Sequence, residues 1–181
     1  MKARTLFAVF ALFLSVAGSA FAQDRRDLRL ADDIVHSILG YTRLTIFDDI
    51  NASVENGAVV LSGKVTTPIK KSDLEHRVAK IDGVRSLRND ISVLPVSPYD
   101  DSLRYRISRA IYNNPSFWNY ASMANPPIHI IVEGGHVTLS GVVNSNVERM
   151  LAGSLAVGNG ELSVKNELKT EEEVRSTLEK L

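Results

Sequence analysis

The sequence predicts an α+β protein made of two tandem copies of a helix, strand, strand, helix, strand unit. A stretch of twelve residues occurs twice, at 54–65 and 132–143, with eight identical positions. The apolar residues that precede it also recur with one spacing, Leu30, Ile34 and Ile38, then Leu103, Ile107 and Ile111. The period is too long for a solenoid unit, so duplication of a whole small domain is the better interpretation.

These repeats and the segments around them divide the chain into five parts. We expect a signal peptide at 1–22, a first domain at 24–94, a linker at 95–98, a second domain at 99–169 and a terminal helix at 170–181. The linker is short and contains two prolines, which predicts that the domains are held close together.

The N-terminal segment has the features of a cleaved export signal. Lys2 and Arg4 precede an apolar run, and Ala20-Phe21-Ala22 is a small-x-small cleavage pattern, so we expect the mature chain to begin at Gln23. The apolar run is too short for a transmembrane span, although a retained membrane anchor is the alternative. Without Lys2 and Arg4 the chain has 19 basic and 21 acidic residues. This balance lacks the excess of positive charge that is typical of proteins that bind nucleic acid.

Each repeated stretch reads as the turn and second strand of a β-hairpin. Asn56-Gly57 and Gly134-Gly135 supply the positive φ of a tight turn, and alternating apolar residues follow. Leu61 and Leu139 are therefore predicted to be buried equivalents. The glycine inside each second strand, Gly63 or Gly141, indicates a bulge or the close approach of a packed helix.

The remaining elements follow from periodicity and capping signals. The first helix spans 27–39, a second begins at Thr67-Pro68, and a third strand covers 87–93. In the second copy Ser97 caps a helix, and Thr170 with Glu173 forms a capping box. The apolar residues of its second helix are Val147, Met150 and Leu151, with Ser154, and its last strand contains Leu162, Val164 and Leu168. The connection from helix to hairpin is five residues longer in this copy and covers 114–127.

These residues resemble the BON domain of bacterial envelope proteins. The matching pattern is an apolar helix, a Val-x-x-Gly-x-Val-x-Leu-x-Gly-x-Val hairpin, a helix and a Gly-Val-x-x-Leu-x-Asn-x-Ile strand, all of which the first copy carries over 27–93. The second copy departs from it, since Gly160-Glu161-Leu162 replaces Gly83-Val84. The resemblance implies, in each copy, a three-stranded mixed sheet with two helices packed on one face.

The residue pattern argues against catalysis. The chain has no cysteine, which excludes thiol chemistry and disulfides. His129 and His136 flank the hairpin turn, but a register pairing Val132 with Val137 places them opposite different residues, so no metal site is expected. Ser62 and Ser140 lie within strands and form no nucleophile elbow. Adjacent acids such as Asp48-Asp49 are more often caps or solvated faces, and no cofactor is indicated.

Binding is the class of function that remains. The resemblance implies a non-catalytic periplasmic protein that contacts phospholipid at the membrane surface and supports envelope integrity or osmotic-stress tolerance. The alternative is a structural module that binds an envelope protein, or itself, without lipid. Solute binding in a deep pocket is weaker, because a domain of about 70 residues has little core to spare for a cavity.

The candidate lipid-binding residues come from comparing the two equivalent helices. The second one carries aromatic and basic residues, and the longer loop after it adds more: Tyr105, Arg106, Arg109, Tyr112, Phe117, Trp118 and Tyr120. Tyrosine and tryptophan suit a membrane interface, and arginine suits anionic headgroups. The alternative is that these rings pack against the first domain or close the loop as a small core of its own.

Overall fold

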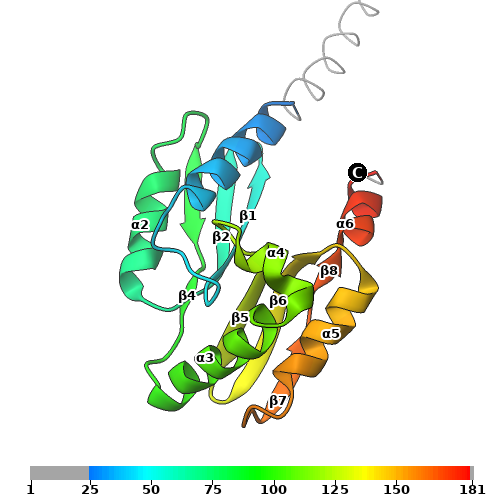
Figure 1. Cartoon of the computed structure of the whole chain (residues 1–181). Coiled ribbons are helices and arrows are strands. Elements are labelled where there is room, and N and C mark those ends of the chain that lie inside the picture. The colour runs from blue at the N-terminus through cyan, green and yellow to red at the C-terminus, as the bar shows by residue number, and fades with distance from the viewer. Residues whose placement is uncertain (1–24, 180–181) are drawn as a thin grey trace, which may run out of the picture.

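The computed structural model describes residues 25–179, so the expected signal peptide lies outside the described residues. Two domains of the same topology follow one another along the chain (Figure 1). Within the described residues no helix has the length and apolar character needed to cross a membrane.

The first domain begins with a helix over 25–39, followed by a hairpin, a helix and a broken third strand. Its elements are β1 (Asp49–Glu55), β2 (Ala58–Val65), α2 (Pro68–Val78), β3 (Ser86–Asn89) and β4 (Ser92–Val93). β2 lies at the centre, antiparallel to β1 and parallel to β3 and β4. This order leaves β1 at one edge of the sheet.

The second domain repeats this arrangement and adds two short helical turns. Its elements are α3 (Pro98–Tyr112), η1 (Pro115–Phe117), α4 (Trp118–Ala121), β5 (Ile128–Glu133), β6 (His136–Val143), α5 (Asn146–Ala156), β7 (Ser163–Asn166) and β8 (Lys169–Thr170), with α6 (Glu171–Leu178) after them. β5 takes the edge position that β1 has in the first domain. The α+β tandem fold predicted from the sequence is confirmed, with the third strand in two pieces.

Each domain encloses its own core between helices and sheet. Leu61 and Leu139 are both fully buried, as the repeat predicted. The apolar helix positions are buried in both copies: Leu30, Ile34 and Ile38, and Leu103, Ile107 and Ile111. Ser97 and Thr170 cap their helices as expected, whereas Thr67 occupies the N-cap of α2 without a side-chain hydrogen bond.

The third strand of each domain is interrupted by an asparagine, Asn89 or Asn166. The side-chain amide donates to a carbonyl of the second helix, that of Lys71 at 3.2 Å and that of Arg149 at 2.8 Å. The side-chain oxygen accepts from the backbone N–H two residues further on. The asparagine therefore ties the strand to the helix.

The glycines inside β2 and β6 are required by the close approach of backbone from the neighbouring strand, not of a packed helix, which was one of the two alternatives expected there. Gly63 and Gly141 have φ of +116° and +113°. A Cβ at Gly63 would lie 2.1 Å from the carbonyl oxygen of Asp49, and one at Gly141 would lie 1.9 Å from that of Pro127. Both the positive φ and the close backbone exclude a side chain.

Helix α5 presents a face that the sequence interpretation did not anticipate. Val147 and Met150 are 74% and 67% exposed, and the residues that reach zero exposure are Ala152 and Ala156. Leu151 and Leu155 are half-buried against the core, so the outer side of the helix carries Val147 and Met150.

Candidate binding surface of the second domain

The longer loop of the second domain folds into that domain's own core. Phe117 and Tyr120 are 0% and 5% exposed, with stacked rings whose centroids are 6.0 Å apart. The turn that directs them inward starts at Asn114, whose side-chain oxygen accepts from the backbone N–H of Ser116. Phe117 and Tyr120 are therefore not part of an exposed lipid-binding surface, which corrects the expectation for both.

Tyr120 also fixes the position of α4. Its hydroxyl donates to a Glu148 carboxylate oxygen at 2.6 Å and accepts from the backbone N–H of Asn144 at 3.0 Å. Burial and the adjacent Glu148 carboxylate raise the pKa of Tyr120 to about 12. The bond holds α4 beside the first turn of α5.

The first domain closes the corresponding junction with a buried ion pair. Asp48, expected to be a cap or a solvated carboxylate, is buried and accepts from the Lys70 ammonium at 2.6 Å. It also accepts from the backbone N–H groups of Thr45 and Thr66, each at 2.8 Å. Burial raises the pKa of Asp48, but the bonds from Lys70, Thr66 and Thr45 outweigh it and hold the pKa below its usual value.

The Tyr112 hydroxyl is likewise hydrogen-bonded within the protein. Its hydroxyl donates to the carbonyl of Ile128 at 2.7 Å and receives the backbone N–H of the same residue at 3.2 Å. Burial raises the pKa of Tyr112. The expectation of an interfacial role was wrong for Tyr112 too, because its polar end points at β5.

The other four predicted residues lie on the surface, three of them on different sides of α3 and Trp118 on α4. Tyr105 is 59% exposed and meets the ring of Phe47 edge to face at 5.5 Å, so it faces the first domain. Arg106 lies on the opposite side, where its Nε donates to the carbonyl of Asn159 at 2.8 Å. Arg109 and Trp118 are exposed, the tryptophan by 63%.

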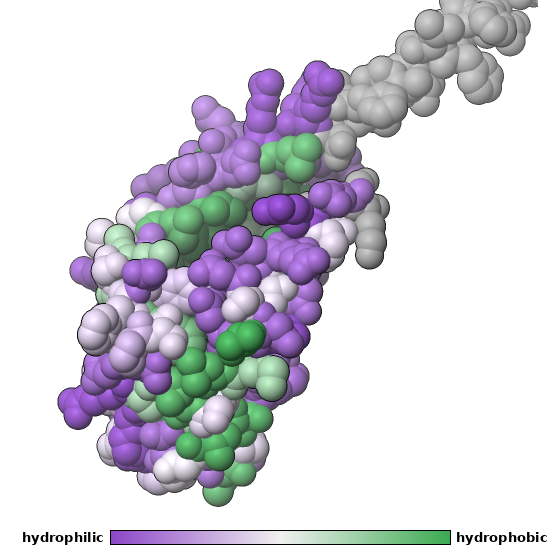
Figure 2. Space-filling model, turned by 45° about the vertical axis from the view of Figure 1, so that its right-hand side comes forward, coloured by the Kyte–Doolittle hydropathy of each residue, from purple (hydrophilic) through white to green (hydrophobic). Residues whose placement is uncertain are grey.

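The outer face of α5 adds bulky apolar residues that sequence reasoning did not assign to a surface. Val147 and Met150 lie on the first part of α5, the helix that the Tyr120–Glu148 bond joins to α4, and Val157 after the end of the helix is 61% exposed. Figure 2 shows a hydrophobic patch over this part of the molecule. The recurrence of apolar residues at 147, 150 and 157 was the available signal, but it also fits a buried stripe.

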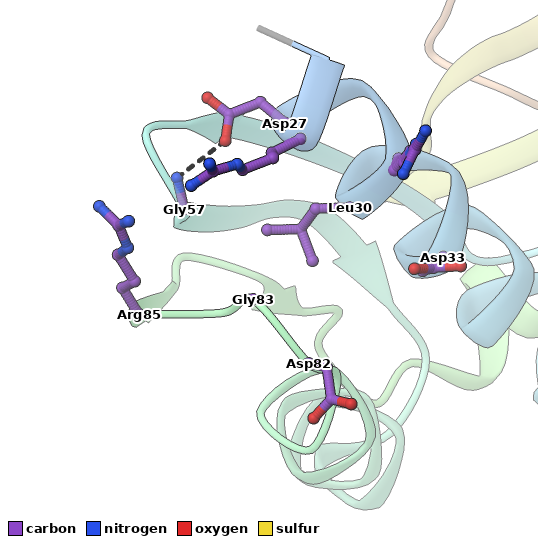
Figure 3. A pocket seen from close by; sticks show the side chains of 9 residues that line it. Asp27, Leu30, Asp33, Gly57, Asp82, Gly83 and Arg85 are labelled. Atoms are coloured by element: carbon purple, nitrogen blue, oxygen red, sulfur yellow. Dashed lines mark hydrogen bonds between the residues drawn. The ribbon is translucent and has the colours of Figure 1, made fainter. Parts of the chain in front are cut away.

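A hollow of about 370 Å³ lies in the first domain, where the first helix meets the hairpin turn (Figure 3). Asp27 accepts from the backbone N–H groups of Asn56 and Gly57 at 2.6 and 3.1 Å. The residues that line the hollow include both basic and acidic side chains: Arg26, Arg29 and Arg85, and Asp27, Asp33 and Asp82. At the equivalent position of the second domain, the Tyr99 hydroxyl donates to the carbonyl of Gly160.

The two histidines that flank the second hairpin turn do not lie opposite one another. Val132 pairs with Val137 as predicted, so His129 lies opposite Ser140 and His136 opposite Glu133. No group of three or more potential metal ligands occurs among residues 25–179.

The family of the chain follows from a comparison with family models. The model described as BON domain matches residues 27–95 and 100–172. The chain therefore belongs to the BON domain family, in tandem form. BON domains are non-catalytic binding domains associated with membrane or protein interactions.

Comparisons with individual proteins add little beyond the family. The chain is 18% identical to CdsD, a structural protein of the type III secretion system of Chlamydia trachomatis, with a TM-score of 0.29 and coverage of 83% of this chain and 97% of that one. A structure of the CdsD C-terminal domain is 16% identical, with a TM-score of 0.27 and coverage of 75% and 96%. The search of curated proteins returned no match.

Proposed function

We propose that this chain is a non-catalytic protein of the bacterial envelope that docks on phospholipid through the helices of its second domain. The observation that carries the proposal is the cluster of exposed apolar side chains on α4 and α5. Trp118, Val147 and Met150 are each more than 60% exposed, on two helices that the Tyr120–Glu148 bond holds together.

The chemistry of this surface suits the boundary between headgroups and acyl chains. Tryptophan has an apolar body and a polar N–H, and it partitions to that boundary. Arg109 is exposed and, within residues 25–179, pairs with no carboxylate, so its guanidinium is available to an anionic headgroup. A peripheral surface of this kind gains binding from both apolar area and charge.

Location and role are part of the same proposal. The signal sequence expected at 1–22 and the BON family support a periplasmic protein. There, docking on phospholipid would support envelope integrity or osmotic-stress tolerance. Fractionation that found the uncleaved chain in the inner membrane would contradict the periplasmic assignment.

The test is co-sedimentation of the chain 23–181 with vesicles of zwitterionic lipid, with and without anionic lipid. We expect Trp118→Ala and Met150→Gln to weaken binding to both vesicles, and Arg109→Glu to weaken binding only to anionic ones. Binding lost with Arg109 should also be the salt-sensitive part.

Matched controls come from the first domain. Ile69 occupies the position equivalent to Val147 and is 59% exposed, and Lys80 is an exposed cation distant from this surface. Ile69→Gln and Lys80→Glu are therefore expected to bind like the wild type. If no variant differs from the wild type, or the wild type does not bind, lipid docking is wrong and the protein-binding alternative is the better account.

A further inference from the structure

The edge strands of the two sheets, β1 and β5, differ in the hydrogen bonds that their outward backbone groups make. In the second domain three contacts close the edge of β5. The Tyr112 hydroxyl donates to the backbone carbonyl of Ile128 and accepts from its backbone N–H. The backbone N–H of Ile130 donates to the carbonyl of Ile46 at 2.7 Å. The Arg104 guanidinium donates to the carbonyl of Val132 at 2.6 Å. Ile128, Ile130 and Val132 are all fully buried.

One of these contacts comes from a segment of the first domain lying in the groove between α3 and β5. Ile46 and Phe47 pack against the core of the second domain, and the Phe47 ring meets Tyr105. The carbonyl of Ile46 takes the place of a strand partner on the edge of β5. An apolar Ile-Phe pair at the centre of a turn, with one main-chain hydrogen bond to the strand edge, is therefore what this groove already accepts within the chain.

The equivalent groove of the first domain has no such occupant in the described residues. The register relates Ile128, Ile130 and Val132 to Ile50, Ala52 and Val54. Ala52 is exposed and the other two are half-buried. Within residues 25–179 nothing donates to, or accepts from, the outward backbone groups of β1, although it is a seven-residue strand.

The residues that close the edge in the second domain are replaced in the first. Asp27 and Asp100 each accept from their hairpin turn, which fixes the alignment of the two helices. That alignment places Ala31 where the second domain has Arg104, and Leu39 where it has Tyr112. Neither alanine nor leucine can hydrogen-bond to a strand edge.

What these replacements leave is an apolar wall along an open strand. Leu28, Val35 and Leu39 on the first helix are 61%, 47% and 52% exposed. Figure 2 shows a band of hydrophobic residues along this part of the molecule, with a hollow beside it. A wall of apolar side chains next to unpaired main-chain groups is the arrangement that recognises peptides by strand addition.

We propose that the groove between the first helix and β1 binds an extended apolar segment of a partner polypeptide, which adds to β1 as an outer strand. The first helix offers no side chain that bonds to this edge, whereas a main chain laid along β1 satisfies its outward N–H and C=O groups together. The equivalent groove of the second domain accepts an isoleucine next to a phenylalanine, Ile46-Phe47. A second copy of this chain has its own Ile46-Phe47 buried in cis, which favours a partner segment. The proposal is independent of lipid docking.

The test uses the chain 23–181 and a labelled peptide with the sequence of residues 42–49. We expect saturable binding in the range of about 10–100 µM. Amide NMR shifts should be centred on residues 50–54 and on the first helix. A peptide carrying Ile46→Asp and Phe47→Asp should not bind.

Two variants, each with a matched control, test the backbone of β1 and the apolar side chains of the first helix separately. Ala52→Pro removes only the outward donor, which an edge strand tolerates, and should weaken peptide binding at least tenfold. Ala52→Val keeps the donor and should stay within twofold. Val35→Asp should weaken binding at least tenfold, and Val96→Asp, on a residue 95% exposed in the linker, should not.

Other outcomes would overturn the proposal. Absence of binding would mean that the groove does not accept the peptide. Equal binding by Ala52→Pro, or shifts centred on α3 and β5, would mean that the peptide binds at another place. Shifts at β1 that depend on protein concentration without peptide, with a dimer in sedimentation, would assign the edge to a second copy. Shifts at the first helix with lipid vesicles but not with peptide would assign the groove to acyl chains.

Discussion

The Asp100 carboxylate accepts a hydrogen bond from the backbone N–H of Gly135 at 2.8 Å, and its second oxygen accepts from Gly134 at the same distance. The carboxylate is 34 residues away from the turn and fully enclosed. It links the first turn of α3 to the hairpin, as Asp27 does in the first domain.

Replacing Asp100 by alanine is expected to cost about 2–4 kcal/mol of unfolding free energy, because two N–H groups lose their acceptor. Asp33→Ala, on an exposed helix position, is the control and should change stability by less than about 0.5 kcal/mol. Urea unfolding followed by circular dichroism measures both. Equal stability of the two variants would mean that water replaces the carboxylate at the turn.

Truncation of either buried leucine should destabilise its own domain. Leu61→Ala and Leu139→Ala each remove a side chain with no exposure, and the expected cost is about 2–5 kcal/mol each. Hydrogen exchange should show the loss of protection mainly in the mutated domain. A neutral alanine variant at either position would contradict the equivalence of the two cores.

Acid should weaken the first domain through Asp48. Its pKa is lowered in the folded protein, so its contribution is complete above the unfolded value of about 3.9 and is lost as the pH falls through the folded value. The difference in stability between wild type and Asp48→Asn should therefore be largest at pH 6 and shrink towards pH 3. A difference that is constant with pH would show that the charge of Asp48 contributes nothing.

The strand glycines and the turn glycines should respond differently to alanine. Gly141→Ala brings a Cβ within 1.9 Å of the Pro127 carbonyl oxygen and is expected to cost more than about 3 kcal/mol. Gly134→Ala meets nothing within 4 Å at φ +59° and should cost about 1 kcal/mol. Thermal unfolding of the two variants is the measurement. A mild Gly141→Ala would show that β5 can move away from β6.

Periodic segments were predicted well from the sequence, since one buried side of a helix or strand has a definite spacing. The spacing of Leu103, Ile107 and Ile111 identified the buried side of α3 correctly. α5 was harder, because small Ala152 and Ala156 carry less apolar signal than the exposed Val147 and Met150.

The candidate site was predicted less well, for physical reasons specific to its residues. Phe117 and Tyr120 lie in η1 and α4, helices of three and four residues that are too short for a period to indicate which side is buried. Tyr112 was placed on the outer side of its helix, but a backbone carbonyl of β5 lies within reach of its hydroxyl. The packing of Ile46 and Phe47 on the second domain is a tertiary contact that local sequence does not reveal.

The packing of Ile46 and Phe47 on the second domain also sets an order of events during synthesis. A chain emerges from the ribosome N-terminal end first, and domains generally fold in that order. Ile46 and Phe47 therefore exist long before α3 and β5, which receive them. Until those elements fold, the isoleucine and the phenylalanine lack the groove that covers them in the complete structure, so their burial is a late step in the folding of the first domain.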